Sequence, residues 1–128
     1  MDFKKLERAD DEATGAVEVA VVLDAAEVHR QLAEFYGAVG AACKLPSDAQ
    51  WDDVDAAGAR TMPPEDYREV RRDFVVNRAA GEALAALGIE PALTPSVRAT
   101  AYPDAGEDFA FELSAVERPA LSLSSADP

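Results

Sequence analysis

The sequence predicts an α+β domain in which two helices pack on one face of a mostly antiparallel sheet. Three observations lead to this class. Apolar residues alternate over Val17–Leu23 and again over Phe109–Glu117, as they do in strands with one buried face. Between these segments, apolar residues recur at helical spacing after Asp24 and again after Pro63. Since residues Phe3–Arg8 are suited to a short edge strand, the predicted order is β(β)ααββ.

The first helix is expected to begin after Asp24. An aspartate at the N-cap accepts a backbone N–H, and Glu27 three residues later fits a capping box. Gly37 and Gly40 are expected to loosen the end of this helix. Its apolar stripe consists of Val28, Leu32, Phe35, Tyr36 and Val39.

The second helix is expected to begin at Pro63-Pro64, because proline suits the first turn and Glu65 and Asp66 suit its positive end. Gly88 is a natural stop. The segment 41–62 between the two helices is predicted to be an irregular loop. The core positions expected on the second helix are Tyr67, Val70, Phe74, Ala79, Ala83, Leu84 and Leu87.

A hairpin is expected to close the domain. Its strands lie near Val97–Tyr102 and Phe109–Glu117, and Pro103–Gly106 has the composition of a turn. Pro119 is expected to end the ladder before Leu121 and Leu123. The side chains predicted to face the first helix are Phe109, Phe111 and Leu113.

Composition excludes several classes of partner. The 25 acidic residues outnumber 12 basic ones, and a formal charge of −13 repels RNA and anionic membranes, so neither is an expected partner. The 128 residues, 48% of them apolar, suit one folded domain, 1–128. There is no apolar stretch of the length of a membrane span, no secretory signal pattern, and only one cysteine, Cys43. We therefore expect a cytoplasmic protein.

Catalytic chemistry is not expected of this chain. The sequence offers no nucleophile–base pair, phosphate loop or metal cluster, so neither an enzyme nor a cofactor is predicted. His29 has no second histidine or nearby cysteine beside it, and Cys43 has no neighbouring base. Trp51 leaves two alternatives open, an exposed interface anchor or a ring folded back onto the core. Two alternatives also stay open for the arginines of the second helix, which form either a basic stripe or a solvent-exposed, ion-paired helix face. They are Arg68, Arg71, Arg72 and Arg78.

Three stretches, in order, resemble the N-terminal, ribosome-binding domain of trigger factor, the bacterial chaperone. The first is Leu6–Arg8 followed by Ala16–Leu23 and Asp24, which opens a helix. The second is the long helix running into Leu84–Pro91, and the third is Gly106–Leu123, which opens with Gly-Glu-Asp-Phe. The resemblance implies a domain that binds unfolded or nascent polypeptide. It also implies that prolyl isomerisation belongs to a different domain of the longer family members. Two readings stay open, an excised domain of a longer chain and a small stand-alone relative.

The docking signature of that family is largely absent. It reads Gly-Phe-Arg-x-Gly-Lys-x-Pro and lies between the helices. Set against Val39–Pro46, only Lys44 and Pro46 match, while Gly40 and Ala41 replace the phenylalanine and the arginine. The loss of a guanidinium and a ring predicts weak or no binding to the ribosome. The candidate protein-binding residues are Lys44, Leu45, Pro46 and Trp51.

The leading functional hypothesis is therefore a trigger-factor-like chaperone module with weak or no ribosome docking. The alternative is a generic protein-interaction or dimerisation domain, acting for instance as a homodimer, without chaperone activity.

Overall fold

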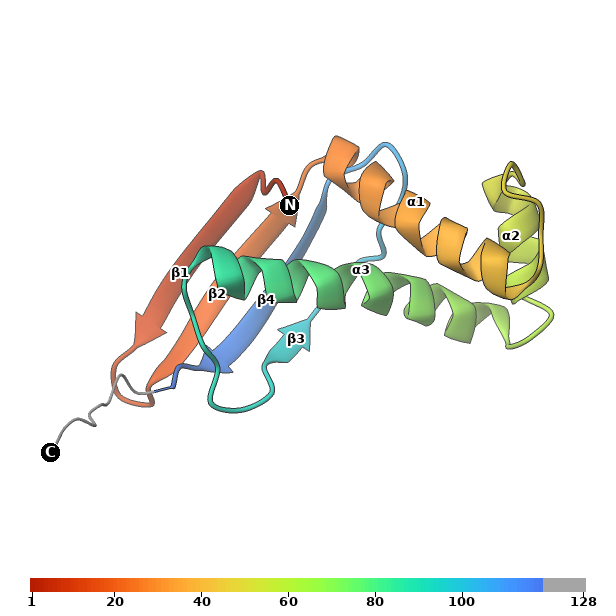
Figure 1. Cartoon of the computed structure of the whole chain (residues 1–128). Coiled ribbons are helices and arrows are strands. Elements are labelled where there is room, and N and C mark those ends of the chain that lie inside the picture. Colours follow the sequence, from red (N-terminus) through yellow and green to blue (C-terminus); the bar gives the residue numbers. More distant parts are fainter. Residues whose placement is uncertain (119–128) are drawn as a thin grey trace, which may run out of the picture.

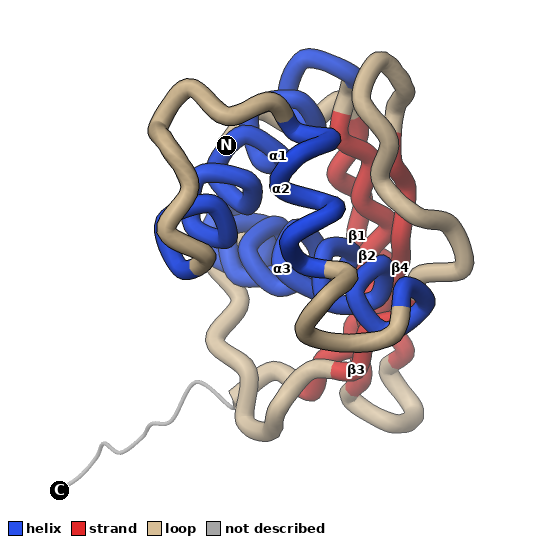
Figure 2. The backbone as a smooth tube through the Cα atoms, turned by 90° about the vertical axis from the view of Figure 1, so that its right-hand side faces the viewer, coloured by secondary structure: helices blue, strands red, loops and turns tan. Residues whose placement is uncertain are grey.

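A layer of helices covers one face of a four-stranded antiparallel sheet in the computed structural model, which describes residues 1–118 (Figure 1). Figure 2 shows the two layers from the side. The strand order is β1-β2-β4-β3, so β1 and β3 form the edges. The predicted α+β class and antiparallel sheet are confirmed. The elements in chain order are β1 (Lys5–Asp11), β2 (Ala16–Leu23), α1 (Ala25–Ala42), α2 (Trp51–Gly58), α3 (Pro64–Ala86), β3 (Ser96–Arg98) and β4 (Phe109–Val116).

The core is built on the two central strands. Every second residue of β2 and β4 is buried, and the intervening residues are half-buried or, like Glu18 and Glu112, exposed. The antiparallel register sets Val19 opposite Leu113 and Val21 opposite Phe111, so the apolar residues form cross-strand rows. The buried face consists of Val17, Val19, Val21, Leu23, Phe109, Phe111, Leu113 and Ala115.

The predicted apolar stripe of helix α1 is largely buried. Its members Val28, Leu32, Phe35 and Tyr36 are buried, and Val39 is half-buried. The Asp24 side chain accepts the Glu27 N–H at 2.9 Å, as expected of an N-cap. The helix runs through Gly37 and Gly40 to Ala42, so these glycines do not end it.

Helix α3 begins at Pro64, within the predicted pair of prolines, and ends at Ala86. Gly88, the predicted stop, follows the C-cap with a φ of 68°. The prediction of Val70 as a core residue is wrong, because its side chain is 45% exposed. Val75 and Val76, which the prediction omitted, are buried instead. Both lie one turn before Ala79 and Ala80, so the face that meets the sheet is rotated from the predicted one.

Two segments differ from the prediction. The predicted loop 41–62 contains α2, so three helices are present where two were expected. The predicted strand Val97–Tyr102 is reduced to Ser96–Arg98, because the chain then leaves the sheet and Tyr102 packs against Arg68, 3.9 Å from guanidinium carbon to ring centre. The expected break at Pro119 and the pair Leu121 and Leu123 lie outside the described residues. No helix within residues 1–118 is long and apolar enough to cross a membrane.

The burial of Phe111, which is 4% exposed, gives a test of the strand register. We expect Phe111→Ala to lower the free energy of unfolding by about 3–5 kcal/mol, because the ring leaves a cavity in the core. Urea denaturation followed by circular dichroism measures this. The exposed Glu107→Ala is the control and should change stability by less than about 0.5 kcal/mol.

Candidate protein-binding site at the helical tip

The ends of α1 and α3 project past the sheet, and α2 packs at that end (Figure 1). We call this part, from Tyr36 through loop 43–50 and α2 to Arg71, the helical tip. It contains all four residues that the sequence singled out for protein binding.

The loop leaves α1 by a tight, hydrogen-bonded cap. Lys44 donates its N–H to the Ala41 carbonyl at 3.1 Å, and Leu45 donates to the Gly40 carbonyl at 2.9 Å. This is the Schellman pattern, in which the residue after the C-cap takes a left-handed conformation. Lys44 takes that place, with a φ of 60°, where glycine is usual. A side chain there costs about 1–2 kcal/mol, which the cap and the packing of Leu45 against the core offset.

Trp51 opens α2 and folds back onto α1. Its ring stacks on Tyr36 with centres 4.5 Å apart and planes 19° apart, and it lies 5.0 Å from the His29 ring. His29 and Tyr36 are two turns apart on α1, so both rings lie on one side of that helix. Trp51 is half-buried, as expected of a ring folded back, and its role as an interface anchor stays a prediction. The indole is packed against α1 and still reaches the surface.

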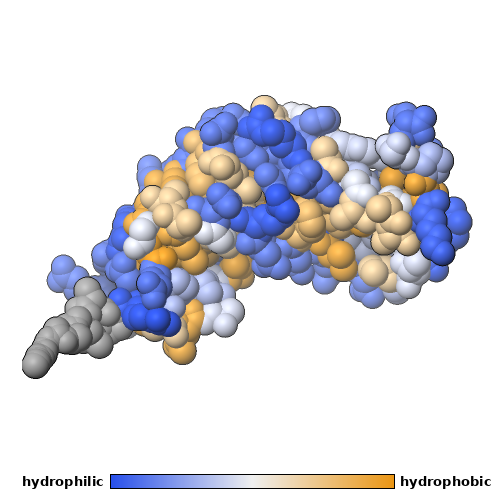
Figure 3. All heavy atoms as spheres, in the orientation of Figure 1, coloured by the Kyte–Doolittle hydropathy of each residue, from blue (hydrophilic) through white to orange (hydrophobic). Residues whose placement is uncertain are grey.

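A groove of about 290 Å³ lies between α1 and the loop. Apolar and small side chains line most of it, and on the face shown in Figure 3 apolar residues reach the surface at the tip between hydrophilic ones. Leu45, Pro46 and Trp51 are brought together in its wall. Lys44 is exposed beside them and does not line it. The other lining residues are Ala33, Tyr36, Gly37, Gly40, Ala41, Ser47, Ala49 and Val54.

A carboxylate at the back of the tip ties three helices together. Asp55 on α2 accepts the Tyr67 hydroxyl at 2.8 Å and the Tyr36 hydroxyl at 3.2 Å. Arg71 donates to the Tyr36 oxygen at 2.8 Å and lies 3.8 Å from Asp104. Burial and the neighbouring Asp55 carboxylate raise the pKa of Tyr67, so the phenol stays a hydrogen-bond donor. The sequence analysis missed this cluster because two of its members, Tyr36 and Tyr67, were counted only as core residues.

The four arginines of α3 fit neither sequence alternative as a whole. Arg71 points inward to the cluster, and Arg68 lies on the Tyr102 ring. Arg72 pairs with Asp73 at 3.1 Å, and Arg78 lies 3.7 Å from Glu34 on α1. No free basic stripe is formed within the described residues.

Gly58 ends α2 against Tyr67, which makes a matched pair of glycine substitutions informative. A Cβ at Gly58 would lie 2.7 Å from Cδ1 of the Tyr67 ring, whereas a Cβ at Gly81 on α3 meets nothing within 4 Å. We expect Gly58→Ala to destabilise the chain by about 1–3 kcal/mol through overpacking. Gly81→Ala should stabilise it by about 0.5–1 kcal/mol, because alanine is the better helix former. Thermal melts measure both, and equal effects would contradict the close packing of Gly58.

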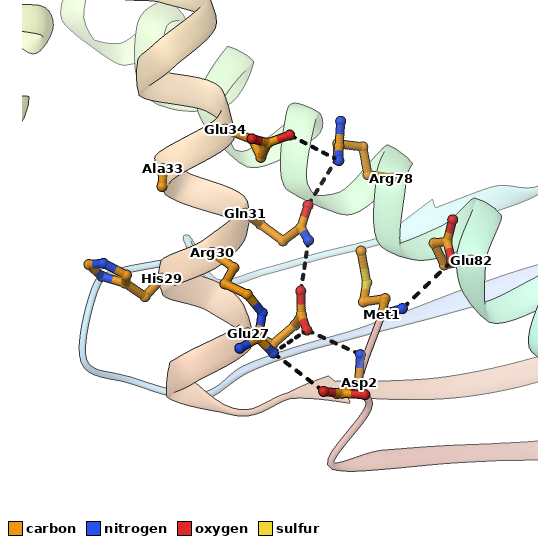
Figure 4. A pocket seen from close by; sticks show the side chains of 10 residues that line it. All are labelled: Met1, Asp2, Glu27, His29, Arg30, Gln31, Ala33, Glu34, Arg78 and Glu82. Carbon is orange, nitrogen blue, oxygen red and sulfur yellow. Dashed lines mark hydrogen bonds and ion pairs between the residues drawn. The ribbon is translucent and has the colours of Figure 1, made fainter. Parts of the chain in front are cut away.

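A polar hollow of about 870 Å³ lies between α1, α3 and the N-terminal segment (Figure 4). Its side chains are already paired. Gln31 donates to Glu27 at 2.7 Å and accepts from Arg78 at 3.0 Å, and Arg30 donates to Glu27 at 2.6 Å. We interpret the hydrogen-bonded side chains of this hollow as the link between α1 and α3. They also hold the N-terminal segment, because the backbone N–H of Asp2 donates to Glu27 at 3.1 Å. In the predicted capping box, the Glu27 carboxylate would accept the backbone N–H of the N-cap residue. In the structure it accepts hydrogen bonds from Arg30, Gln31 and the backbone of Asp2 instead.

Glu27 is 3% exposed and ionised. Burial on its own would raise its pKa, but the hydrogen bonds from Arg30, Gln31 and Asp2 outweigh burial and lower the pKa from 4.5 to about 2. The charged form is therefore favoured by folding. Its contribution is present above pH 4.5 and is lost as the pH falls from there toward 2.

We expect wild-type stability to fall by about 3 kcal/mol more than that of Glu27→Gln between pH 5 and pH 2. The glutamine keeps the shape and removes the titrating group. Urea denaturation at several pH values measures the difference. Parallel pH profiles for the two proteins would show that Glu27 does not carry this dependence.

Within residues 1–118, no three His, Cys, Asp or Glu side chains gather in a way that could hold a metal ion. Cys43 is half-buried at the end of α1. A comparison with protein-family models finds no match, and a comparison with curated proteins finds none either.

Proposed function

We propose that the chain is a polypeptide-binding module of the trigger-factor type, which holds exposed apolar segments of unfolded or nascent chains at the helical tip. The observation that carries the proposal is the apolar groove lined by Leu45, Pro46 and Trp51. It lies in the connection after the first helix, the segment in which the resemblance to trigger factor places the ribosome-docking signature.

The size of the groove favours a polypeptide over a small molecule. At about 290 Å³ it is at the lower limit of ordinary ligand pockets, and it suits one or two side chains of an extended chain. Two buried apolar side chains contribute about 3–6 kcal/mol before the costs of association. Such binding has a dissociation constant of about 40 µM or weaker, which suits transient holding and release.

Ribosome docking is expected to be weak. Lys44 is the one basic residue of the loop 43–50, and it is exposed, where a single charge contributes little. The alternative function, a protein-interaction or dimerisation domain, is favoured by a different surface, the free edge of the sheet.

Holding activity can be tested by aggregation of a chemically denatured client enzyme diluted into buffer. We expect the chain to slow light scattering when in molar excess, and Trp51→Ser and Leu45→Ser to lose most of the effect. Trp51 is the only tryptophan, so its fluorescence should also change when a permanently unfolded client is added.

Leu93→Ser is the matched control. Leu93 is an apolar loop residue with 69% exposure that does not line the groove, so this variant should protect as well as the wild type. Melting curves check that each variant is folded. If the wild-type chain gives no protection at any ratio, the chaperone hypothesis fails and the interaction-domain alternative takes its place.

A further inference from the structure

The edge strand β1 has an open side. Within residues 1–118 it pairs with β2 alone, over all seven of its residues. Six of the seven are exposed, and Leu6 is half-buried. A free edge of this length can add a strand from another chain, since its outward N–H and C=O groups have no strand partner.

The charges of β1 are separated along its length. Lys5 stands at its beginning, and Asp10 and Asp11 stand at its end. A second copy of β1 running antiparallel sets the basic end of each strand against the acidic end of the other. A parallel copy would set like charges against each other, which is destabilising.

Geometry limits the register. A two-fold axis perpendicular to the sheet relates two antiparallel copies, so a residue must lie opposite itself on that axis. Full overlap of Lys5–Asp11 places Arg8 on the axis. Lys5 of each copy then lies opposite Asp11 of the other copy, with Cβ atoms about 4.5–5.5 Å apart.

The centre of this register is also compatible with charge. Arg8 would oppose its own copy, but its guanidinium is already bound by Asp10, at 2.9 and 3.0 Å, and lies 3.3 Å from Glu117. In the paired strands, Asp10 of each copy is the diagonal neighbour of Arg8 of the other. Each guanidinium would therefore lie between two carboxylates.

We propose that the chain self-associates through antiparallel pairing of β1 with β1 of a second copy, centred on Arg8, so that the two sheets become continuous. Charges on an edge strand normally discourage pairing. Here the separation of basic and acidic residues along β1 disfavours pairing with other strands and favours antiparallel pairing with β1 of a second copy. The contact is independent of the proposed polypeptide binding, because β1 and the helical tip lie at opposite ends of the molecule (Figure 1).

Light scattering after size exclusion, in about 0.15 M salt, tests the pairing. At this ionic strength the repulsion between two acidic chains is screened beyond about 8 Å. We expect the mass to rise from that of one 13.6 kDa chain toward twice that value between about 10 µM and 1 mM, as suits a small interface. Lys5→Glu and Asp11→Lys should each weaken association at least tenfold. The double variant carrying both changes should restore it, because the opposing charges are exchanged and the net charge is unchanged.

Arg60→Glu and Glu69→Lys make the same charge changes at exposed sites outside both β1 and the groove and should associate like the wild type. A second measurement uses Arg8→Cys in a Cys43→Ser background, where the new thiols of two paired copies face each other across the axis. This variant should form a disulfide-linked dimer faster than the control Glu107→Cys in the same background. A wild-type chain that stays monomeric to about 1 mM, or a double variant as weak as the single ones, overturns the proposal.

Discussion

The one-sided alternation of β2 and β4 is the constraint from which the other features of this structure follow. Because every second residue of both strands is apolar and the two strands pair directly, the sheet has a single face that must be covered. Helices α1 and α3 supply the cover. The opposite face carries residues such as Glu18 and Glu112 and stays in water, and the outermost strand β1 is left with an open edge.

The lengths of the helices explain why there is a tip at all. The 23 residues of α3 span about 35 Å, whereas the eight residues of β4 span about 27 Å. A helix that crosses the strands at an angle cannot lie wholly over them, so the beginning of α3 and the end of α1 extend beyond the sheet. There they need another partner, which α2 provides through Trp51, Val54 and Asp55.

Much of this architecture could be predicted from the sequence, because period-two and helical patterns report burial directly. The central strands, both long helices and the stop at Gly88 were predicted on that basis. Helix α2 was not, since its N-cap Gln50 makes no side-chain hydrogen bond and only eight residues carry the pattern. The short β3 was overestimated because nothing in the sequence shows that Tyr102 prefers an arginine on α3 to the sheet.

For the candidate site, the apolar residues of the groove could be predicted from the sequence, but the hydrogen-bonded cluster behind them could not. Leu45, Pro46 and Trp51 were singled out as a loop surface, and they do line one groove. The Asp55 cluster was out of reach, because it depends on three helices meeting in space. Lys44 was singled out because it matches the docking signature, and its left-handed backbone shows that it also closes the cap of α1.

The position of α2 at the margin of the core has a consequence for motion. Most of the core side chains belong to the sheet and to the parts of α1 and α3 above it, whereas α2 contributes Val54 and is otherwise held by the half-buried Trp51, the contact of Gly58 with Tyr67 and the bonds to Asp55. Regions with few buried contacts open at a lower free energy than the rest of a domain. The backbone amides of α2 should therefore exchange with solvent well before those of β2 and β4. Opening of the tip by itself would change the width of the groove while the sheet below it stays folded.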